Sequence, residues 1–591
     1  MPIKFKRILV ELFYYSSIPL LVLGMLFFFL DVPNQNIKSP MALFSDSMMQ
    51  TIYVKPFFEG ETPFKISRLG APYYHCAYLF PQGANLDYCL AVICSVIFQN
   101  VLSGFNVAWM LKLAIAGLVA AWSFRRLGIS PITSFFLSFV FAFAPYAFLR
   151  NISHFNLSTY LVPYVCCATI VMLRDKLPVF TRRNVFIFSF LFVLVGFGDL
   201  YVAAFSLFLF TIVLLVSFFR QRSRVHVLGT ILVIACVLFG VFLNTLPGIL
   251  ALTDNEAARR EFSTMRSQLG DANKYALRPL ALLLPSEYHP IPFFGKIRVK
   301  MMGPFLSAPG SHESAPLGTT ASIGFLLLLF GGFMSAMRGQ LRGIPEKIAN
   351  GATLPFVLTV ALLLLACFAG FSNIVMVFAS AIRVYGRVSI FIGFFSLVVL
   401  GFTIDAIGGD LGLKCTIKGR TMAYMSAVGL AVLVLFDQGY PPSGPHKSYT
   451  ERWVKSSTAF EELEQFVSSL EAQLPAGAMI YQLPAPFGEV EKHYWYLFNL
   501  KPYVASKSLR WSFAPFSYVS ASGRWHENTA KMPVPELVKY LRREGFSGIW
   551  VDMAFYNNNK KCQATLDEIA EVHDASPLIF SKSRNYAFLK L

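Results

Sequence analysis

The chain has 591 residues, of which 55% are hydrophobic and only 14% are charged, and its formal net charge is +18 at pH 7. Soluble globular proteins carry about 25% charged residues, so this composition excludes an ordinary soluble protein. Several apolar runs reach the ~20 residues that a helix needs to cross the hydrocarbon core of a bilayer. The sequence therefore predicts a polytopic α-helical membrane protein. The positive charge does not require a nucleic-acid partner, because basic residues gather in the cytoplasmic loops of such proteins.

The apolar runs and the positions of arginine and lysine together predict a topology. Lys4, Lys6 and Arg7 favour a cytoplasmic N-terminus. The apolar stretch 86–103 either crosses the membrane or lies along its outer surface, and only the second option keeps Arg125 and Arg126 inside. With that stretch left out, about eleven spans are predicted, at 8–30, 105–124, 131–149, 157–173, 184–199, 200–219, 226–251, 318–337, 352–371, 386–406 and 421–437. The C-terminus is then outside.

The expected organisation is a transmembrane domain over 1–438 followed by a soluble external domain over 439–591. Two external loops of the transmembrane domain are long, at 31–104 and 252–317. The tail has an ordinary soluble composition. Its segments TAFEELEQFVSSLEAQL and VPELVKYLRREG are typical of amphipathic helices, and AMIYQL and GIWVDMAF are typical of buried strands. A small mixed α/β fold is therefore expected for the tail.

The first external loop contains the leading catalytic candidate, Asp46, in the segment MALFSDSMMQTIYV. Its neighbours are apolar, so we expect the segment to lie against the membrane surface. A carboxylate held there is well placed to take a proton from an acceptor hydroxyl. The alternative is an acid that is merely solvated. Asp87 and His75 are secondary candidates in the same loop, and a lone histidine such as His75 is more often structural.

The segment RNISHFNLSTYLVPY interrupts an apolar region with polar residues at the predicted outer end of a span. Arg150, His154 and Asn156 should therefore face the same side of the membrane as Asp46. Asp199, in GFGDLYVAAF, falls at another outer turn. An acid between long apolar runs is costly unless it is paired or hydrated, so Asp199 is a candidate functional residue. The alternative is that it caps the helix that follows.

The segment AIRVYGRVSIF places Arg383 and Arg387 four residues apart, on one face if the segment is helical. Arginine favours bidentate contact with phosphate, although ordinary anionic lipid headgroups would satisfy the same side chains. A carboxylate and cations at one membrane face are the groups that a displacement with a phosphate leaving group requires. No nucleotide-binding loop, nucleophile elbow or zinc-protease motif is present. A lipid phosphate carrier is therefore the natural donor of the group that this displacement would transfer.

The block FNVAWMLKLAIAGLVAAWSFRRLGISPITSFFLSFVFAFAPYAFLRNISHFNLSTYLVPY resembles bacterial integral-membrane glycosyltransferases of the GT-C superfamily. The matching pieces are Arg125–Gly128, Phe143–Tyr146, Ser153–Leu157 and Leu161–Tyr164, with Ser153 at a position where the family has glycine. The resemblance implies a catalytic carboxylate in the first external loop, here Asp46, and helices along the outer membrane surface. The family often has two adjacent acids in that loop. Here a serine follows Asp46, which leaves any role of a divalent cation open.

The hypothesis is a GT-C-like glycosyltransferase of a bacterial inner membrane, with its C-terminal domain on the periplasmic side. It would move a sugar from a polyprenyl-phosphate donor to a glycan or lipid acceptor, with Asp46 as general base and Arg383 and Arg387 binding the donor phosphate. The other expected substrate-binding residues are Asp87, Arg150, His154, Asn156 and Asp199. No metal ligands are predicted, and the expected partners are the donor, the acceptor and membrane lipids, without nucleic acid. The rival hypotheses are a lipid or glycan flippase or transporter, a membrane O-acyltransferase and a non-catalytic assembly factor.

Overall fold

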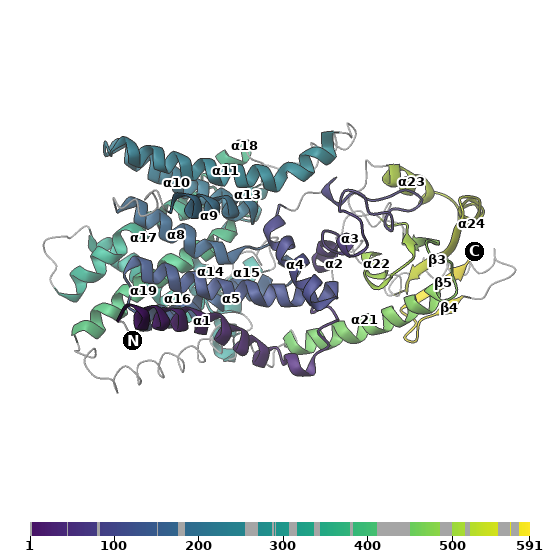
Figure 1. Cartoon of the computed structure of the whole chain (residues 1–591), viewed down its shortest axis with the longest axis horizontal. Helices are drawn as coiled ribbons and strands as arrows, with labels where there is room; N and C mark the ends of the chain where they lie inside the picture. Colours follow the sequence, from purple (N-terminus) through teal and green to yellow (C-terminus); the bar gives the residue numbers. More distant parts are fainter. Residues whose placement is uncertain are drawn as a thin grey trace.

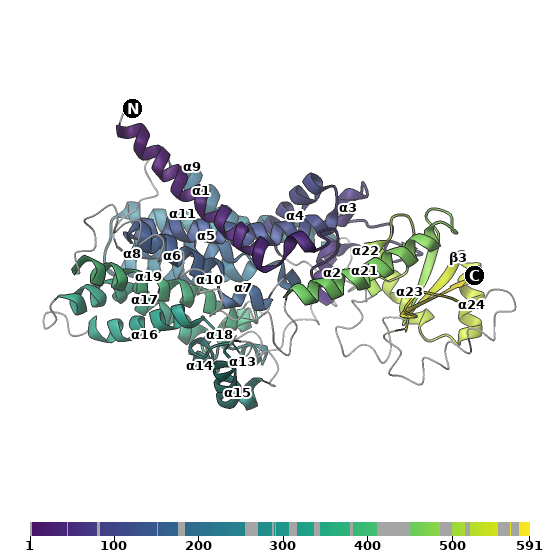
Figure 2. The same ribbon diagram turned by 90° about the horizontal axis from the view of Figure 1, so that it is seen from below.

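The computed structural model describes residues 3–591 except 44, 80–82, 151, 175–183, 254–269, 287–288, 290, 307–315, 336–342, 379–381, 411–448, 485–498, 514–520, 554–567 and 569–577. The described part is mostly helical and ends in a small mixed β-sheet. In Figures 1 and 2 the long helices lie side by side in a bundle, and the sheet lies beyond one end of it. We call that end of the bundle the sheet-side end.

Seven helical segments in the described residues are long and apolar enough to cross a membrane, so the chain is a multi-pass membrane protein. They are formed by α1 (Ile3–Phe29), α5 (Val101–Leu127), α6 (Pro131–Ala142) with α7 (Pro145–Arg150), α10 (Leu200–Phe219), α11 (Arg224–Thr253), α17 (Ile344–Ala366), and α19 (Ser389–Asp410) with the preceding turn η7 (Tyr385–Val388). All seven coincide with predicted spans. Three more predicted spans coincide with shorter apolar helices. These helices are α8 (Val162–Leu173), α9 (Val185–Phe197) and α16 (Thr319–Met334). The last predicted span, 421–437, lies outside the described residues.

The ambiguous stretch 86–103 forms a helical hairpin with the next span. Helix α4 (Asn85–Phe98) ends at Gln99, whose φ is 50°, and Asn100 then caps α5 by accepting a hydrogen bond from the Ser103 N–H at 2.8 Å. At 1.5 Å per residue, fourteen residues reach about 21 Å, which is short of the ~30 Å hydrocarbon core. The two helices pack closely, since a Cβ on Gly104 would lie 1.9 Å from Ser95 Oγ. The prediction that leaves this stretch out of the span count agrees with its length.

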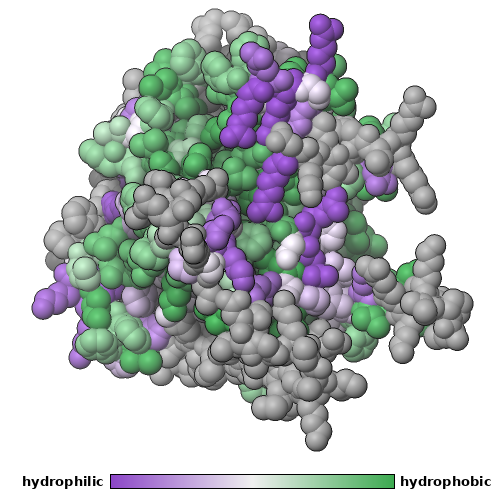
Figure 3. Space-filling view, turned by 90° about the vertical axis from the view of Figure 1, so that its left-hand side faces the viewer, coloured by the Kyte–Doolittle hydropathy of each residue, from purple (hydrophilic) through white to green (hydrophobic). Residues whose placement is uncertain are grey.

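The outer faces of the bundle helices carry large apolar side chains. Phe13, Phe186 and Phe218 are 77%, 84% and 69% exposed. Contiguous apolar surface of this kind is unfavourable in water and is expected where lipid covers it. Figure 3 shows the end face opposite the sheet, where hydrophilic side chains gather in a stripe among hydrophobic ones. The bundle thus has an apolar belt with a polar end.

The C-terminal α/β region, residues 449–591, contains a five-stranded sheet of order β2-β1-β3-β5-β4. Strand β1 (Met479–Leu483) pairs in parallel with β2 (Arg510–Trp511) and β3 (Phe546–Asp552), and β5 (Tyr586–Lys590) pairs antiparallel with β3 and with β4 (Ile579–Phe580). Its helices are α21 (Tyr449–Glu471), α22 (Lys501–Ala505), α23 (Ala521–Thr529) and α24 (Val534–Arg543). The helices and strands predicted in the tail are therefore confirmed.

Short helices connect these parts. They are η1 (Val32–Asn34), α2 (Ser45–Thr51), α3 (Lys55–Phe58), η2 (Ala77–Leu79), η3 (Ile152–His154), η4 (Thr159–Leu161), α13 (Asp271–Lys274), α14 (Pro279–Leu283), α15 (Pro292–Leu306) and α18 (Ser372–Phe378). Helices α2 and α3 lie between the bundle and the sheet (Figure 1). The loop that contains them therefore connects the two parts of the molecule.

Candidate active site

Asp46 lies in the first turn of α2, at the junction between the bundle and the C-terminal α/β region. Met48, Met49 and Ile52 are buried in a hydrophobic cluster that includes residues of both parts. Gln50 Nε2 donates a hydrogen bond of 2.6 Å to the Ser153 carbonyl oxygen, in η3 of the bundle. The apolar neighbours of Asp46 thus pack inside the protein. Residues of both the bundle and the C-terminal region cover them, and the expectation that the segment lies along the membrane surface stays a prediction.

The Asp46 carboxyl lies within electrostatic reach of two arginines from different segments of the bundle. Burial raises the pKa of Asp46, and the positive charges of Arg150 and Arg387 lower it in part. Both arginines are buried, with 4% and 9% of their surface exposed. Arg150 ends α7 and Arg387 lies in η7. The fold therefore brings three charged residues from distant parts of the chain to one place.

Arg387 and Asp199 form the deeper side of this group. The Arg387 guanidinium lies 4.2 Å from the centroid of the Tyr201 ring, which is a cation–π contact. Asp199 caps α10, because its Oδ1 accepts a hydrogen bond of 2.8 Å from the Tyr201 N–H. Its Oδ2 is buried without a hydrogen-bond partner among the described residues. The capping interpretation of Asp199 is confirmed, and one carboxylate oxygen remains available beside Arg387.

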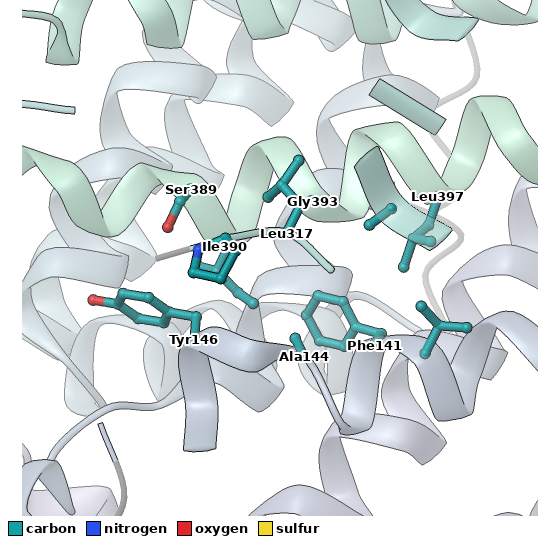
Figure 4. A pocket seen from close by; sticks show the side chains of 11 residues that line it. Phe141, Ala144, Tyr146, Leu317, Ser389, Ile390, Gly393 and Leu397 are labelled. Carbon is teal, nitrogen blue, oxygen red and sulfur yellow. The ribbon is translucent and has the colours of Figure 1, made fainter. Parts of the chain in front are cut away.

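Two adjoining pockets lie at this point. The first is lined by Asp199, Tyr201, Arg387 and Tyr146 together with apolar side chains of α10 and α19. The second is almost wholly apolar, with Phe141, Leu317 and Leu397 among its lining residues (Figure 4). Tyr146 and Ile390 line both pockets. A pocket that contains one acid, Asp199, and one cation, Arg387, therefore lies next to an apolar pocket.

Arg383 is placed differently from Arg387. The α-helix α19 begins only at Ser389, and Arg383 precedes the 3-10 turn η7. Arg383 Nη1 lies 3.6 Å from Asp271 Oδ2, with 39% of its side chain exposed. The sequence places the two arginines on one face only if the segment is helical, and this condition is not met, because the backbone of residues 382–384 is not helical. Only Arg387 is buried beside Asp46 and Asp199, while Arg383 lies at the rim near Tyr201.

Asp87 is not part of the group around Asp46 and has its own partners. It is fully buried, its Oδ1 lies 3.0 Å from Lys112 Nζ, and it accepts hydrogen bonds from the Ser158 and Tyr160 hydroxyls at 2.7 and 3.0 Å. Lys112 also donates to the Phe155 carbonyl oxygen. This network joins α4, α5 and residues 155–160. Its geometry favours a structural role for Asp87 rather than the substrate-binding role expected from the sequence.

The candidate histidines differ in their surroundings. His75 is buried, and burial lowers its pKa to about 3, so it is neutral near neutral pH and unsuited to acid–base work. His154 and Asn156 are partly exposed and lie in or just after η3, the turn that packs against α2. Their positions are therefore close to the helix that carries Asp46. Residue 151 lies outside the described part of the chain.

Metal binding has no preformed ligand set in the part of the chain that the structure describes. No group of three or more histidine, cysteine, aspartate and glutamate side chains there is arranged to hold a metal ion. The positive charges nearest Asp46 are guanidinium groups. A divalent cation at Asp46 would have to compete with them.

Sequence reasoning missed three residues that the fold brings to or near the site. Lys112 is a single lysine inside an apolar span, and an ionisable residue in such a position is a signal of function or pairing. Tyr201 and Tyr146 line the polar pocket. Tyrosines in a chain with 25 of them carry no comparable signal, so only the structure could select these two.

Comparison with known proteins gives overall similarities at low identity. No protein-family model matches the chain, and neither does any curated protein. Among solved structures, the archaeal oligosaccharyltransferase AglB from Archaeoglobus fulgidus, in complex with an inhibitory peptide and a dolichol-phosphate, matches with a TM-score of 0.45 and 11% identity. That match covers 98% of this chain and 74% of AglB.

A second solved structure is the arabinofuranosyltransferase AftD from Mycobacteria, with a TM-score of 0.43 and 15% identity. The match covers 91% of this chain but only 35% of AftD, so the chain spans about a third of that protein. Both TM-scores lie below 0.5.

The role of Asp87 can be tested by stability. Asp87→Asn leaves the buried Lys112 ammonium without its ion-pair partner, and breaking a buried pair from one side costs about 3–5 kcal/mol. The thermal unfolding midpoint in detergent should therefore fall by several degrees, and Asp87→Asn combined with Lys112→Met should recover part of the loss. Lys531→Met, which breaks an exposed pair with Glu527, is the matched control and should change the midpoint little. An unchanged midpoint for Asp87→Asn would contradict the structural role.

Proposed function

We propose that the chain is a membrane glycosyltransferase that moves a sugar from a polyprenyl-phosphate donor to a glycan or lipid acceptor. The observation that supports this most directly is a carboxyl group, Asp46, near two buried guanidinium groups, Arg150 and Arg387, of which Arg387 lines a pocket next to an apolar one. These are the groups that a displacement with a lipid phosphate leaving group requires. The resemblance of the block from residue 105 to 164 points the same way, and that block contributes both Arg150 and Tyr146 to the site.

The reaction can be written with these residues. The Asp46 carboxylate takes the proton of an acceptor hydroxyl, whose oxygen attacks the anomeric carbon of the donor sugar. The new C–O bond forms as the bond between that carbon and the donor phosphate oxygen breaks, and polyprenyl phosphate leaves with the bonding electron pair. A single displacement inverts the anomeric configuration. The proton remains on Asp46 until it is released to solvent.

The leaving phosphate needs positive charge, and the structure favours a different pair of arginines from the pair expected by spacing. Arg387 and Arg150 both act on Asp46 electrostatically, so both can stabilise charge that develops within the site. Arg383 is held at the rim by Asp271. We therefore assign the phosphate to Arg387 and Arg150, and to Arg383 a role at the entrance. Asp199, His154 and Asn156 would orient the substrates.

We assign the lipid carrier to the two adjoining pockets, which would have to widen to admit it. Phosphate would lie near Arg387 in the polar pocket, and the first isoprene units would enter the apolar pocket past Tyr146 and Ile390 (Figure 4). Burial of a CH₂ group contributes about 0.8 kcal/mol, so even a few isoprene units add substantially to binding.

The proposed location is the inner membrane of a bacterium, with the site at its outer face. Arg125 lies at the end of α5, and Arg222 donates hydrogen bonds of 2.7 Å to the last carbonyls of α8, so basic residues gather at the end of the bundle away from Asp46. The enrichment of basic residues on the cytoplasmic side supports this orientation.

The base assignment is tested with Asp46→Asn, which keeps the size of the side chain and removes its basicity. Transfer from a polyprenyl-phosphate sugar by the purified protein in proteoliposomes should fall by at least about 10²-fold, the usual contribution of a general base. Membrane insertion should be unchanged, and the unfolding midpoint should fall only slightly, because Asp46 is partly exposed. Full activity of this variant would remove Asp46 from the mechanism. A flippase would instead move the donor across the bilayer without consuming it.

The phosphate assignment is tested by mass spectrometry of lipid that co-purifies with the protein, which requires no knowledge of the acceptor. The intact protein should retain a polyprenyl phosphate that carries a sugar. Arg387→Met should lose most of it, because the buried phosphate contact is removed, whereas the matched variant Arg383→Met should retain most of it. Equal loss in both variants would show that the rim arginine contributes as much as the buried one.

The pH dependence of transfer follows from the burial of Asp46. Burial raises the pKa of Asp46, and a base works only when deprotonated, so kcat should fall with decreasing pH at a value above the ordinary aspartate pKa of about 3.9. Arg150→Met removes a charge that lowers this pKa, so the acid limb of the kcat profile should move to higher pH. Arg150→Lys, which keeps the charge, is the control. An acid limb that stays in place in Arg150→Met would contradict the arrangement.

A further inference from the structure

Both ends of the helix that carries Asp46 are attached to the C-terminal α/β region. Just before α2, the Leu43 N–H donates a hydrogen bond of 3.3 Å to Ser456 Oγ in α21. Just after α2, Lys55 Nζ donates to the Val504 and Ser506 carbonyl oxygens at 3.2 and 3.0 Å, at the C-terminus of α22. A cation at the C-terminus of a helix is favourable, because the last carbonyl groups lack partners within the helix.

The rest of the same loop continues the sheet of the C-terminal region. The Trp511 N–H donates to the Arg68 carbonyl oxygen at 2.9 Å, and the Ala71 N–H donates to the Trp511 carbonyl oxygen at 3.1 Å. Residues 68–71 thus lie parallel to β2 as an added edge segment. The Arg510 guanidinium reinforces the contact by donating to the carbonyl oxygens of Ser67, Pro72 and Tyr73 at 2.9–3.1 Å.

A buried set of charges joins the two attachments. Glu59 accepts from Arg68 and from the Tyr503 hydroxyl, the latter at 3.0 Å, and it lies 3.4 Å from Lys55 Nζ. Burial lowers the pKa of Lys55 to about 8, with Glu59 opposing the shift, so the ammonium remains charged near neutral pH. Removing one member of such a network leaves a buried charge unsatisfied. The loop is therefore held in one position relative to the C-terminal region.

The acid and the cations of the proposed site thus belong to different parts of the molecule. Arg150 and Arg387 are built into the bundle. Asp46 is carried by a short helix whose flanking residues are bonded to the C-terminal region. The same segment also contacts the bundle, through the hydrogen bonds of Gln50 to Ser153 and of Met41 to Asn106. The separation between base and phosphate-binding groups therefore depends in part on where the C-terminal region holds α2.

We propose that the C-terminal α/β region is the element that positions Asp46, with Lys55 and Ser456 as positioning residues at the two ends of α2. This inference rests on the proposed function of Asp46 as base. The C-terminal region would then have a role in catalysis, although the region itself contributes no reacting group. A displacement of a catalytic group by about 1 Å can cost 10²-fold in rate, so small losses of attachment should be visible in kcat.

The first test compares the effect of each variant on kcat with its effect on the KM for the donor. Lys55→Met removes both hydrogen bonds to α22 while keeping the apolar stem, and it should lower kcat by about tenfold or more. The donor KM and the co-purifying lipid should stay unchanged, because the bundle arginines hold the donor. Ser456→Ala is a milder second variant, Lys55→Arg should restore most of kcat, and Lys531→Met is the control for an exposed lysine. Unchanged kcat in Lys55→Met and Ser456→Ala, or an equal loss of donor binding, would overturn the proposal.

The second test does not depend on the chemistry. When the native cysteines, including the exposed Cys89, are replaced by serine and Asp46 is replaced by cysteine (Asp46→Cys), the rate of labelling by a membrane-impermeant maleimide reports the exposure of α2. Adding Lys55→Met should raise that rate several-fold, whereas adding Lys531→Met should not. An unchanged rate would overturn the positioning role. If Asp46→Asn proves active while the labelling rate still rises, the base assignment fails and the attachment of α2 stands, so the two failures are distinguishable.

Discussion

The site depends on the mutual neutralisation of charges that would be unfavourable if buried alone. A carboxylate or guanidinium removed from water loses several kcal/mol of hydration, and only nearby opposite charge and hydrogen bonds restore it. Asp46, Arg150, Asp199 and Arg387 come from α2, α7, the start of α10 and η7. The two arginines favour the charged form of Asp46, and Arg387 also favours that of Asp199. The packing of these segments at the sheet-side end is therefore tied to the chemistry that the site can perform.

Two other buried polar networks support that arrangement, and the first of them lies within electrostatic reach of Asp199. The Asp87–Lys112 pair holds α4 against α5 and residues 155–160, next to the turn that packs on α2. The Glu59–Arg68–Lys55 set holds the first loop against the C-terminal region. In both networks, the acid is surrounded by donors. Asp199 differs, because one of its buried oxygens has no hydrogen-bond partner among the described residues. That contrast is the reason why we propose a substrate-binding role for Asp199 and a structural role for Asp87 and Glu59.

The differences between sequence and structure have one common cause. The spacing of Arg383 and Arg387 predicted the same environment for both, but the chain is not helical before η7. Arg387 is therefore buried against Tyr201, whereas Arg383 pairs with Asp271 at the rim. The apolar residues around Asp46 are buried in a cluster formed by both the bundle and the C-terminal region, which the sequence did not predict. In each case a partner from a distant segment decided the environment. Local patterns contain no information about which distant segment will be adjacent.

The sequence by itself determined the class of the protein, the positions of its long spans, the α/β character of its tail and a short set of charged candidates at one side of the bundle. These follow from run length, from periodicity and from charges flanking apolar segments, which are local properties. Only the tertiary structure decided that Asp46 lies near Arg150 and Arg387, that Asp87 pairs with Lys112, and that residues 68–71 extend the C-terminal sheet. The physical reason is that pairing between charges is set by three-dimensional proximity. Several pairings are compatible with one linear order, and the packing of the whole chain selects among them.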